Sequence, residues 1–178
     1  MQVRVREVLA GLIVSIAATL LQGIAPAPAE AQAPIAAPVK QPILFSHKIH
    51  AGDFKIDCQY CHADARRSTF AGIPSVKRCM GCHQIVASKD AELQKEVEKL
   101  RALWKDAKPV EWVRVHKVAG FVYFPHKRHV QTGLACQQCH GEVQGMTEVA
   151  QVAPLTMGWC VSCHAERKGP LECVTCHH

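Results

Sequence analysis

Ten cysteines in one repeated pattern constrain this chain of 178 residues more than any other feature. Every cysteine belongs to a Cys-x-x-Cys-His motif, and none is left over for a structural disulfide. The five motifs occupy residues 58–62, 79–83, 136–140, 160–164 and 173–177. One such motif is compatible with a redox dithiol or with half of a zinc site. Five copies that each end in histidine argue against both and indicate five sites for covalently attached haem c.

Each motif supplies three groups to one haem. The two thiols form thioethers with one porphyrin, and the adjacent imidazole binds the iron from the same side. We assign the thioether positions to Cys58, Cys61, Cys79, Cys82, Cys136, Cys139, Cys160, Cys163, Cys173 and Cys176. We assign the proximal iron ligands to His62, His83, His140, His164 and His177.

Histidines outside the motifs decide between an electron carrier and an enzyme, because an iron with two strong protein ligands cannot readily bind a substrate. Six are present and five are needed, so five are assigned as distal ligands and one is spare. The assigned ligands are His47, His50, His116, His126 and His129. His178 is taken as the spare, since it adjoins His177 at the chain terminus. Met146 and Met157 are the alternative sixth ligands should one histidine fail.

An internal duplication is visible in the second part of the chain. Residues 45–50, Phe-Ser-His-Lys-Ile-His, match residues 124–129, Phe-Pro-His-Lys-Arg-His, and each pair of histidines is followed by two motifs. The copies cover about 45–83 and 124–164, and the fifth motif follows them. We therefore expect two related units that each hold two haems.

The N-terminal region differs from the rest of the chain. Residues 8–25 form an uncharged, mostly apolar run preceded by Arg4 and Arg6, which predicts a transmembrane helix over 1–25 with its N-terminus in the cytoplasm. The alternative is a signal peptide, since residues 29–31 offer a cleavage site. Residues 26–42 are rich in proline and alanine and predict an extended linker. The haem domain is then 43–178, on the periplasmic side of the inner membrane.

The expected fold class follows from the small number of large apolar side chains available for a hydrophobic core in the haem domain. The chain has only five Phe, three Trp and two Tyr, so the porphyrins must supply much of the buried apolar surface. We expect a mainly irregular and α-helical multihaem cytochrome c domain with a haem-packed core and few short helices. One long helix is predicted between a Ser88 cap and Pro109, with an apolar stripe through Leu93 and Leu100. Residues 121–124 are compatible with a short strand.

The formal net charge of +6 does not indicate a nucleic-acid-binding protein, because the cations are scattered and form no run. Cations near the motifs have a simpler use, which is to balance the ten haem propionates. Candidates for this role are Arg66, Arg67, Lys127 and Arg128.

The Phe-x-His-x-x-His pattern ahead of Cys-x-x-Cys-His resembles the class III multihaem cytochromes c. In that family the first histidine of the pair ligates the haem nearby in sequence, and the second reaches another haem. The resemblance thus implies that His47 serves the first motif and His126 the third, which leaves His50 and His129 for more distant haems. The runs 112–116, 121–126 and 154–160 extend the resemblance to the pentahaem cytochrome subunits of bacterial alternative complex III.

This resemblance implies electron transfer within a membrane quinol-oxidising complex, toward a cytochrome c or similar acceptor. The implied partners are an iron-sulfur protein, a monohaem cytochrome c, the membrane and, indirectly, quinol. Two alternatives stay open: a multihaem reductase in which one iron keeps an open face, and a free-standing membrane-anchored quinol dehydrogenase.

Overall fold

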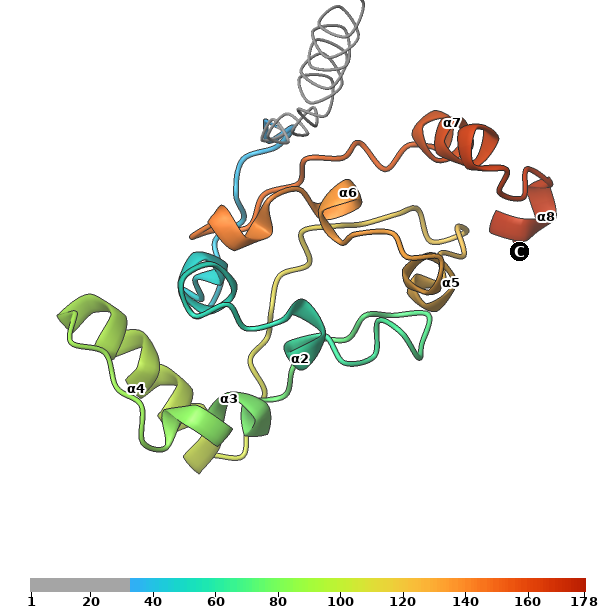
Figure 1. Cartoon of the computed structure of the whole chain (residues 1–178). Helices are drawn as coiled ribbons and strands as arrows, with labels where there is room; N and C mark the ends of the chain where they lie inside the picture. Colours follow the sequence, from blue (N-terminus) through green and yellow to red (C-terminus); the bar gives the residue numbers. More distant parts are fainter. Residues whose placement is uncertain (1–32) are drawn as a thin grey trace, which may run out of the picture. The chain divides into compact units, whose positions relative to one another are not determined.

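The computed structural model describes residues 33–178, which fold into nine short helical elements joined by irregular segments (Figure 1). The predicted membrane anchor or signal peptide and the start of the linker lie outside these residues. Over 33–178, no helix is both long and apolar enough to span a membrane. The elements are η1 (Lys48–Asp53), α2 (Cys58–Cys61), α3 (Val76–His83), α4 (Ala91–Lys105), α5 (His126–Gln131), α6 (Gln137–His140), η2 (Val143–Gly145), α7 (Met157–Arg167) and α8 (Cys173–Cys176).

Helix α4 is the longest of these elements, and a carboxylate fixes its start. Asp90 accepts hydrogen bonds from the amides of Glu92 and Leu93, so Asp90 caps the helix and the predicted Ser88 cap is wrong. Ser88 lies two residues too early and instead accepts a bond from the Asp90 amide. Three ion pairs at i,i+3 spacing cover the exposed face of α4.

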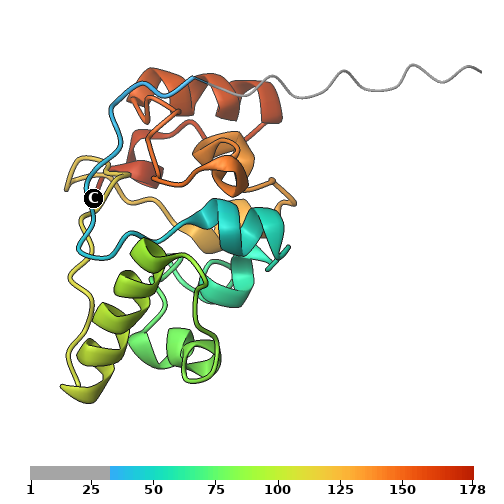
Figure 2. The ribbon, with the colours of Figure 1, turned by 90° about the vertical axis from the view of Figure 1, so that its left-hand side faces the viewer.

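A small apolar cluster attaches α4 to the rest of the domain. Leu100 of α4 packs with Val76 and Met80 of α3 and with Ile43, which precedes the first histidine pair. All four side chains are more than nine-tenths buried. The cluster therefore holds α3, α4 and the start of the haem domain together, and the two helices lie side by side (Figures 1 and 2).

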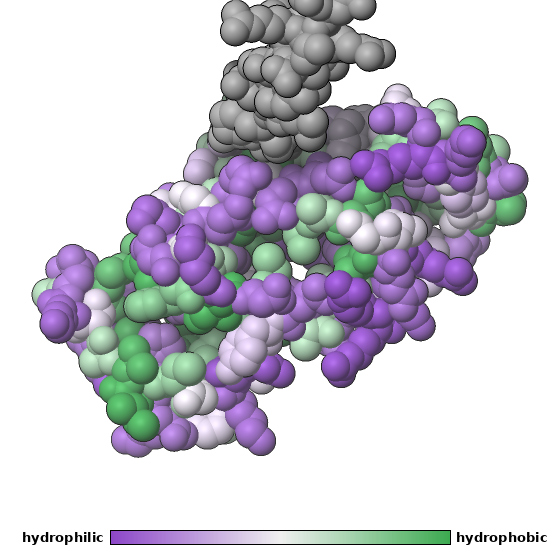
Figure 3. Space-filling view, viewed as in Figure 1, coloured by the Kyte–Doolittle hydropathy of each residue, from purple (hydrophilic) through white to green (hydrophobic). Residues whose placement is uncertain are grey.

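Beyond this cluster, the described residues build little ordinary core. Nine apolar side chains are buried, and no large side chain among these residues is completely shielded from solvent. Many bulky side chains are exposed instead, including Phe54, Phe70 and Phe121. Figure 3 shows apolar residues interspersed with hydrophilic ones over the face in view. This distribution fits a domain in which porphyrins provide the apolar surface that side chains pack against.

Two local expectations need amending. The run 121–124 forms no strand: Val122 makes only one isolated antiparallel bridge, to His177. Helix α7 is a second substantial helix that the sequence analysis did not predict. Thr156 caps it by accepting a bond from the Trp159 amide, and it ends at Lys168 in the left-handed region.

The two similar halves hold one another through equivalent contacts. The Lys48 amide donates to the Met146 carbonyl at 2.9 Å, and the Lys127 amide donates to the Ser68 carbonyl at 3.0 Å. Lys127 follows Lys48 by 79 positions and Met146 follows Ser68 by 78, so these contacts are counterparts. Each half thus supports the histidine-bearing helix of the other, as in a two-fold symmetric interface.

Candidate haem sites

All five Cys-x-x-Cys-His motifs coincide with helices, namely α2, α3, α6, α7 and α8. On a helix, residues three and four positions apart share a face, so both thiols and the histidine of a motif can meet one ligand. None of the ten thiols is in a disulfide. These are the local requirements for two thioethers and one proximal imidazole per haem.

Four proximal histidines face a second imidazole across a constant gap. The ring centroids are 6.5 Å apart for His47 and His62, 6.1 Å for His50 and His83, 6.3 Å for His126 and His140, and 6.0 Å for His129 and His164. The second imidazole comes in every case from one of the two HxxH pairs, which lie at the start of η1 and within α5. Each histidine of an HxxH pair therefore faces a different motif.

This gap matches the space that an iron needs. With about 2 Å for each metal–imidazole bond and about 1.2 Å from each ligating nitrogen to its ring centre, the centroids of two opposite imidazoles stand about 6.4 Å apart. The observed separations lie between 6.0 and 6.5 Å. Direct stacking or edge contact of two imidazoles would bring the centroids closer. The four pairs therefore fit haem iron with two axial histidines.

The second ring nitrogen of most candidate ligands has a hydrogen-bond partner. Nδ1 lies within hydrogen-bonding distance of a backbone carbonyl in six of the paired histidines. The acceptors are Ser46 for His50, Gly72 for His62, Val86 for His83, Thr69 for His126, Pro125 for His129 and Pro170 for His164. A proton on Nδ1 leaves Nε2 for the metal and fixes the ring orientation.

Burial favours the neutral form of two candidate ligands, His47 and His140. It is the main cause that lowers the pKa of His47 to about 4, with His62 and His50 as further causes. Burial also lowers the pKa of His140 to about 4, with His116 and His126 contributing. An imidazole must be unprotonated to bind iron, so both side chains meet this condition well below neutral pH.

The fifth site is less complete within the described residues. The ring beside His177 is that of Phe121, at 5.7 Å, rather than an imidazole. His116 lies 4.5 Å from His140, edge to face, which leaves no room for an iron between those two rings. Its Nε2 is nevertheless buried without a hydrogen-bond partner, as expected for a nitrogen that binds a metal. His116 therefore stays a candidate ligand, but the structure does not bring it opposite His177.

The remaining candidates are placed as follows. His178 lies against the Tyr123 ring at 4.8 Å. Met157 is 66% exposed at the start of α7, and Met146 is half-buried beside η1. Three of the four proposed propionate-balancing cations, Arg67, Lys127 and Arg128, line one open pocket of about 630 Å³. Arg66 instead donates a hydrogen bond to Gln59.

Comparison with known proteins agrees with this geometry. The family model described as "Class III cytochrome C family" matches residues 23–120, which is more than half of the chain. The chain belongs to the class III cytochrome C family. A second model, described as "Cytochrome c7 and related cytochrome c", matches residues 122–178 of this class III cytochrome.

Three relatives share parts of this class III cytochrome. The multiheme cytochrome c subunit of menaquinone reductase from Nitratidesulfovibrio vulgaris is 37% identical over 57% of this chain and 46% of its own length. The multiheme cytochrome MtrA of Shewanella baltica is 26% identical over 64% of this chain and 32% of its own. Cytochrome c7 of Geobacter metallireducens is 38% identical over 33% of this chain and 64% of its own. The matches thus span less than two thirds of each relative.

Sequence reasoning missed the residues that support the ligands. Six backbone carbonyls orient imidazoles, and a carbonyl has no side chain that a motif search could detect. It also missed Arg101 of α4, which bonds to the carbonyls of His83 and Val86. The only sequence signal for Arg101 was its place on the predicted helix, which gave no sign of a role at a haem site.

Proposed function

We propose that this class III cytochrome is an electron relay that holds five haems c in one continuous order. The four imidazole pairs at 6.0–6.5 Å carry this proposal. When bound, each haem supplies a one-electron Fe(III)/Fe(II) couple. Two histidines bound to one iron would close it to substrates, so such a site would transfer electrons without binding a reactant. We number the sites I to V in the order of their motifs.

The shared helices make sites I and II neighbours, and sites III and IV neighbours. His47 and His50 lie three residues apart around η1 and face sites I and II. His126 and His129 lie three residues apart on α5 and face sites III and IV. Side chains at this spacing are about 5–6 Å apart at Cβ, so each helix turn brings two iron positions together.

Other contacts join these two couples and add site V. The thiols of Cys58 and Cys136, at equivalent positions in the two halves, interact with each other, which connects sites I and III. The Cys176 carbonyl accepts a bond from the Tyr123 amide, three residues before His126, and Cys176 also lies near Cys160. The order of sites is therefore II, I, III, IV, V. Helices α3 and α7, with sites II and IV, lie toward opposite ends of the domain in both views (Figures 1 and 2).

We further propose that the relay is the pentahaem subunit of a membrane quinol-oxidising complex of the alternative complex III type. Similarity to a menaquinone reductase subunit supports a link to quinone chemistry. The apolar run at residues 8–25 supports an anchor in the inner membrane with the haem domain on the periplasmic side. In this arrangement an iron-sulfur protein delivers electrons and a monohaem cytochrome c removes them.

One observation favours a second function. Among the described residues no imidazole stands opposite His177, and the exposed Phe121 ring lies there instead. If no ligand joins site V in the holoprotein, its iron would be open to a small molecule, as in a multihaem reductase.

Two measurements on the holoprotein decide between these functions. Intact mass after haem extraction with acid acetone gives the number of covalent haems, for which we expect five. Electron paramagnetic resonance (EPR) of the oxidised protein gives the spin states. Five low-spin haems support the relay, whereas one fully populated high-spin haem supports the reductase. Fewer than five covalent haems would overturn the proposed cofactor content.

The membrane role needs a separate test. Affinity purification of the full-length chain from solubilised membranes should recover an iron-sulfur subunit, a monohaem cytochrome and quinol-dependent reduction of the haems. Recovery of the chain alone with full quinol oxidation would instead indicate a free-standing quinol dehydrogenase. Recovery from the soluble fraction would contradict the proposed location.

A further inference from the structure

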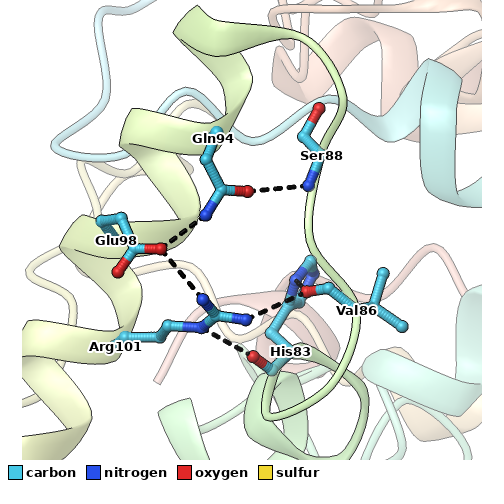
Figure 4. A network of polar contacts seen from close by, with 6 residues as sticks. All are labelled: His83, Val86, Ser88, Gln94, Glu98 and Arg101. Atoms are coloured by element: carbon cyan, nitrogen blue, oxygen red, sulfur yellow. Dashed lines mark hydrogen bonds and ion pairs between the residues drawn. The ribbon is translucent and has the colours of Figure 1, made fainter.

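The loop after site II contains a polar network that meets the proximal ligand His83 (Figure 4). Arg101 of α4 donates from Nε to the His83 carbonyl at 2.9 Å and from Nη2 to the Val86 carbonyl at 3.5 Å. Nη1 donates to the Glu98 carboxylate at 2.9 Å. Gln94 completes the network by donating to Glu98 and accepting from the Ser88 amide. Arg101 is thus held by three acceptors, two of which are backbone carbonyls at and just after the end of α3.

The Val86 carbonyl is the acceptor that connects this network to the haem ligand. Nδ1 of His83 lies 3.3 Å from the same oxygen that Arg101 approaches. The corresponding bonds of His62 and His164, to Gly72 and Pro170, are both 2.6 Å long and involve no arginine. The proximal imidazole of site II therefore has the weakest of these three hydrogen bonds, and it shares its acceptor with a cation.

Both features act on the iron in the same direction. A strong bond from Nδ1–H to a carbonyl gives the imidazole more negative character, which stabilises ferric iron and lowers the reduction potential. A weak, shared bond removes part of that effect. A fixed positive charge beside the ligand also disfavours the more positive ferric state. The Arg101 side chain is only 29% exposed, so solvent screens this charge incompletely.

We propose that Arg101 is a positioning residue that raises the reduction potential of the haem at site II through its contacts with His83 and Val86. Site II is one end of the proposed order of sites, so a raised potential there shifts the distribution of electrons toward that end. The rise in potential rests on the proposed function only in requiring that site II holds haem.

The test is a mediated redox titration of the holoprotein, in which each haem takes up one electron from the titrant. Arg101→Gln removes the charge and frees the Val86 carbonyl for His83. We expect the ratio of reduced to oxidised haem at one site to fall about threefold to tenfold at fixed ambient potential, where tenfold corresponds to about 59 mV. Glu98→Gln should shift the same haem in the opposite direction, since it removes the neutralising carboxylate. Lys95→Gln, with the same loss of charge on the exposed face of α4, should shift none.

A second substitution that shifts the potential of site II alone marks its haem and shows which haem Arg101→Gln affects. His50→Met should raise the potential of site II strongly, because a thioether replaces an imidazole opposite His83. The Arg101→Gln shift must then fall on the marked haem. Arg101→Lys keeps the charge without the paired donors and should retain part of the effect, most clearly at low ionic strength. Five covalent haems with unchanged potentials in Arg101→Gln, or a shift on an unmarked haem, would overturn this inference. Absence of haem from site II of the unmodified protein would count against the proposed function instead.

Discussion

The imidazole rings of His47 and His62 lie nearly parallel, with an interplanar angle of 5° across a centroid separation of 6.5 Å. Their counterparts in the second half, His126 and His140, are inclined by only 12°. The second histidine of each HxxH pair behaves differently. The angle is 56° at site II and 40° at site IV. The duplication therefore produces two kinds of imidazole pair, and each kind occurs once per half.

These angles predict two classes of oxidised spectrum. Parallel imidazole planes lift the degeneracy of the iron d orbitals and give rhombic low-spin EPR signals, whereas strongly inclined planes give signals with a larger maximum g value. We expect sites I and III in the first class and sites II and IV in the second. His50→Met should remove a signal of the second class and His47→Met one of the first. Loss of a rhombic signal in His50→Met would contradict the assignment of ligands.

Removal of one distal imidazole should open one iron and no more. His129 faces His164 at 6.0 Å, and its Nδ1 lies 3.0 Å from the Pro125 carbonyl. His129→Ala should therefore convert one haem in five to a high-spin form that binds carbon monoxide when reduced. The matched control is His178→Ala, because His178 lies against Tyr123 and is not assigned to an iron. A new high-spin haem in His178→Ala would show that the spare histidine had been chosen wrongly.

Close packing between η1 and η2 leaves no space for a side chain at Gly52. A Cβ on Gly52 would collide with the backbone carbonyl of Gln144, which cannot move aside as a side chain can. Gly52→Ala should destabilise the holoprotein by about 1–3 kcal/mol, as overpacking does in tight interiors. Denaturant unfolding followed at the Soret band measures this loss. Gly145→Ala changes the other side of the same junction, where a Cβ meets nothing, and should have little effect. Equal stability of the two variants would contradict close packing at this junction.

The sequence predicted the chemistry of the sites better than their arrangement. The motifs specify thioethers and proximal ligands because these groups are adjacent in the chain, and the cluster around Leu100 follows from helical periodicity. The pairing of His50 with His83 and of His129 with His164 joins residues 33 and 35 positions apart within one half. It depends on the path of the intervening chain, which the spacing of the motifs does not specify.

The residue that caps α4 could not be predicted from the sequence either. Ser88 and Asp90 are both good capping residues two positions apart, so composition alone could not choose between them. The carboxylate of Asp90 reaches two amides at once, and this decides where α4 begins. Arg101 illustrates the opposite case, since its position on the helix was foreseeable but its contact with His83 was not.

We expect the stability of the fold to depend on pH through the carboxylate of Glu96, which lies near the first histidine pair. Glu96 accepts bonds from Lys99 and from the Leu44 amide, and its pKa is lowered chiefly by the Lys99 bond. Because the folded pKa lies below the unfolded one, the ionised carboxylate stabilises the fold above its usual pKa, and this contribution is lost as the pH falls through the lowered value. Glu96→Gln should therefore lose stability at neutral pH and show a shallower decline on acidification in guanidinium unfolding. Glu92→Gln, which removes an exposed partner of Lys95, should keep the steeper decline of the unmodified protein. Identical acid profiles for Glu96→Gln and the unmodified protein would exclude this role for Glu96.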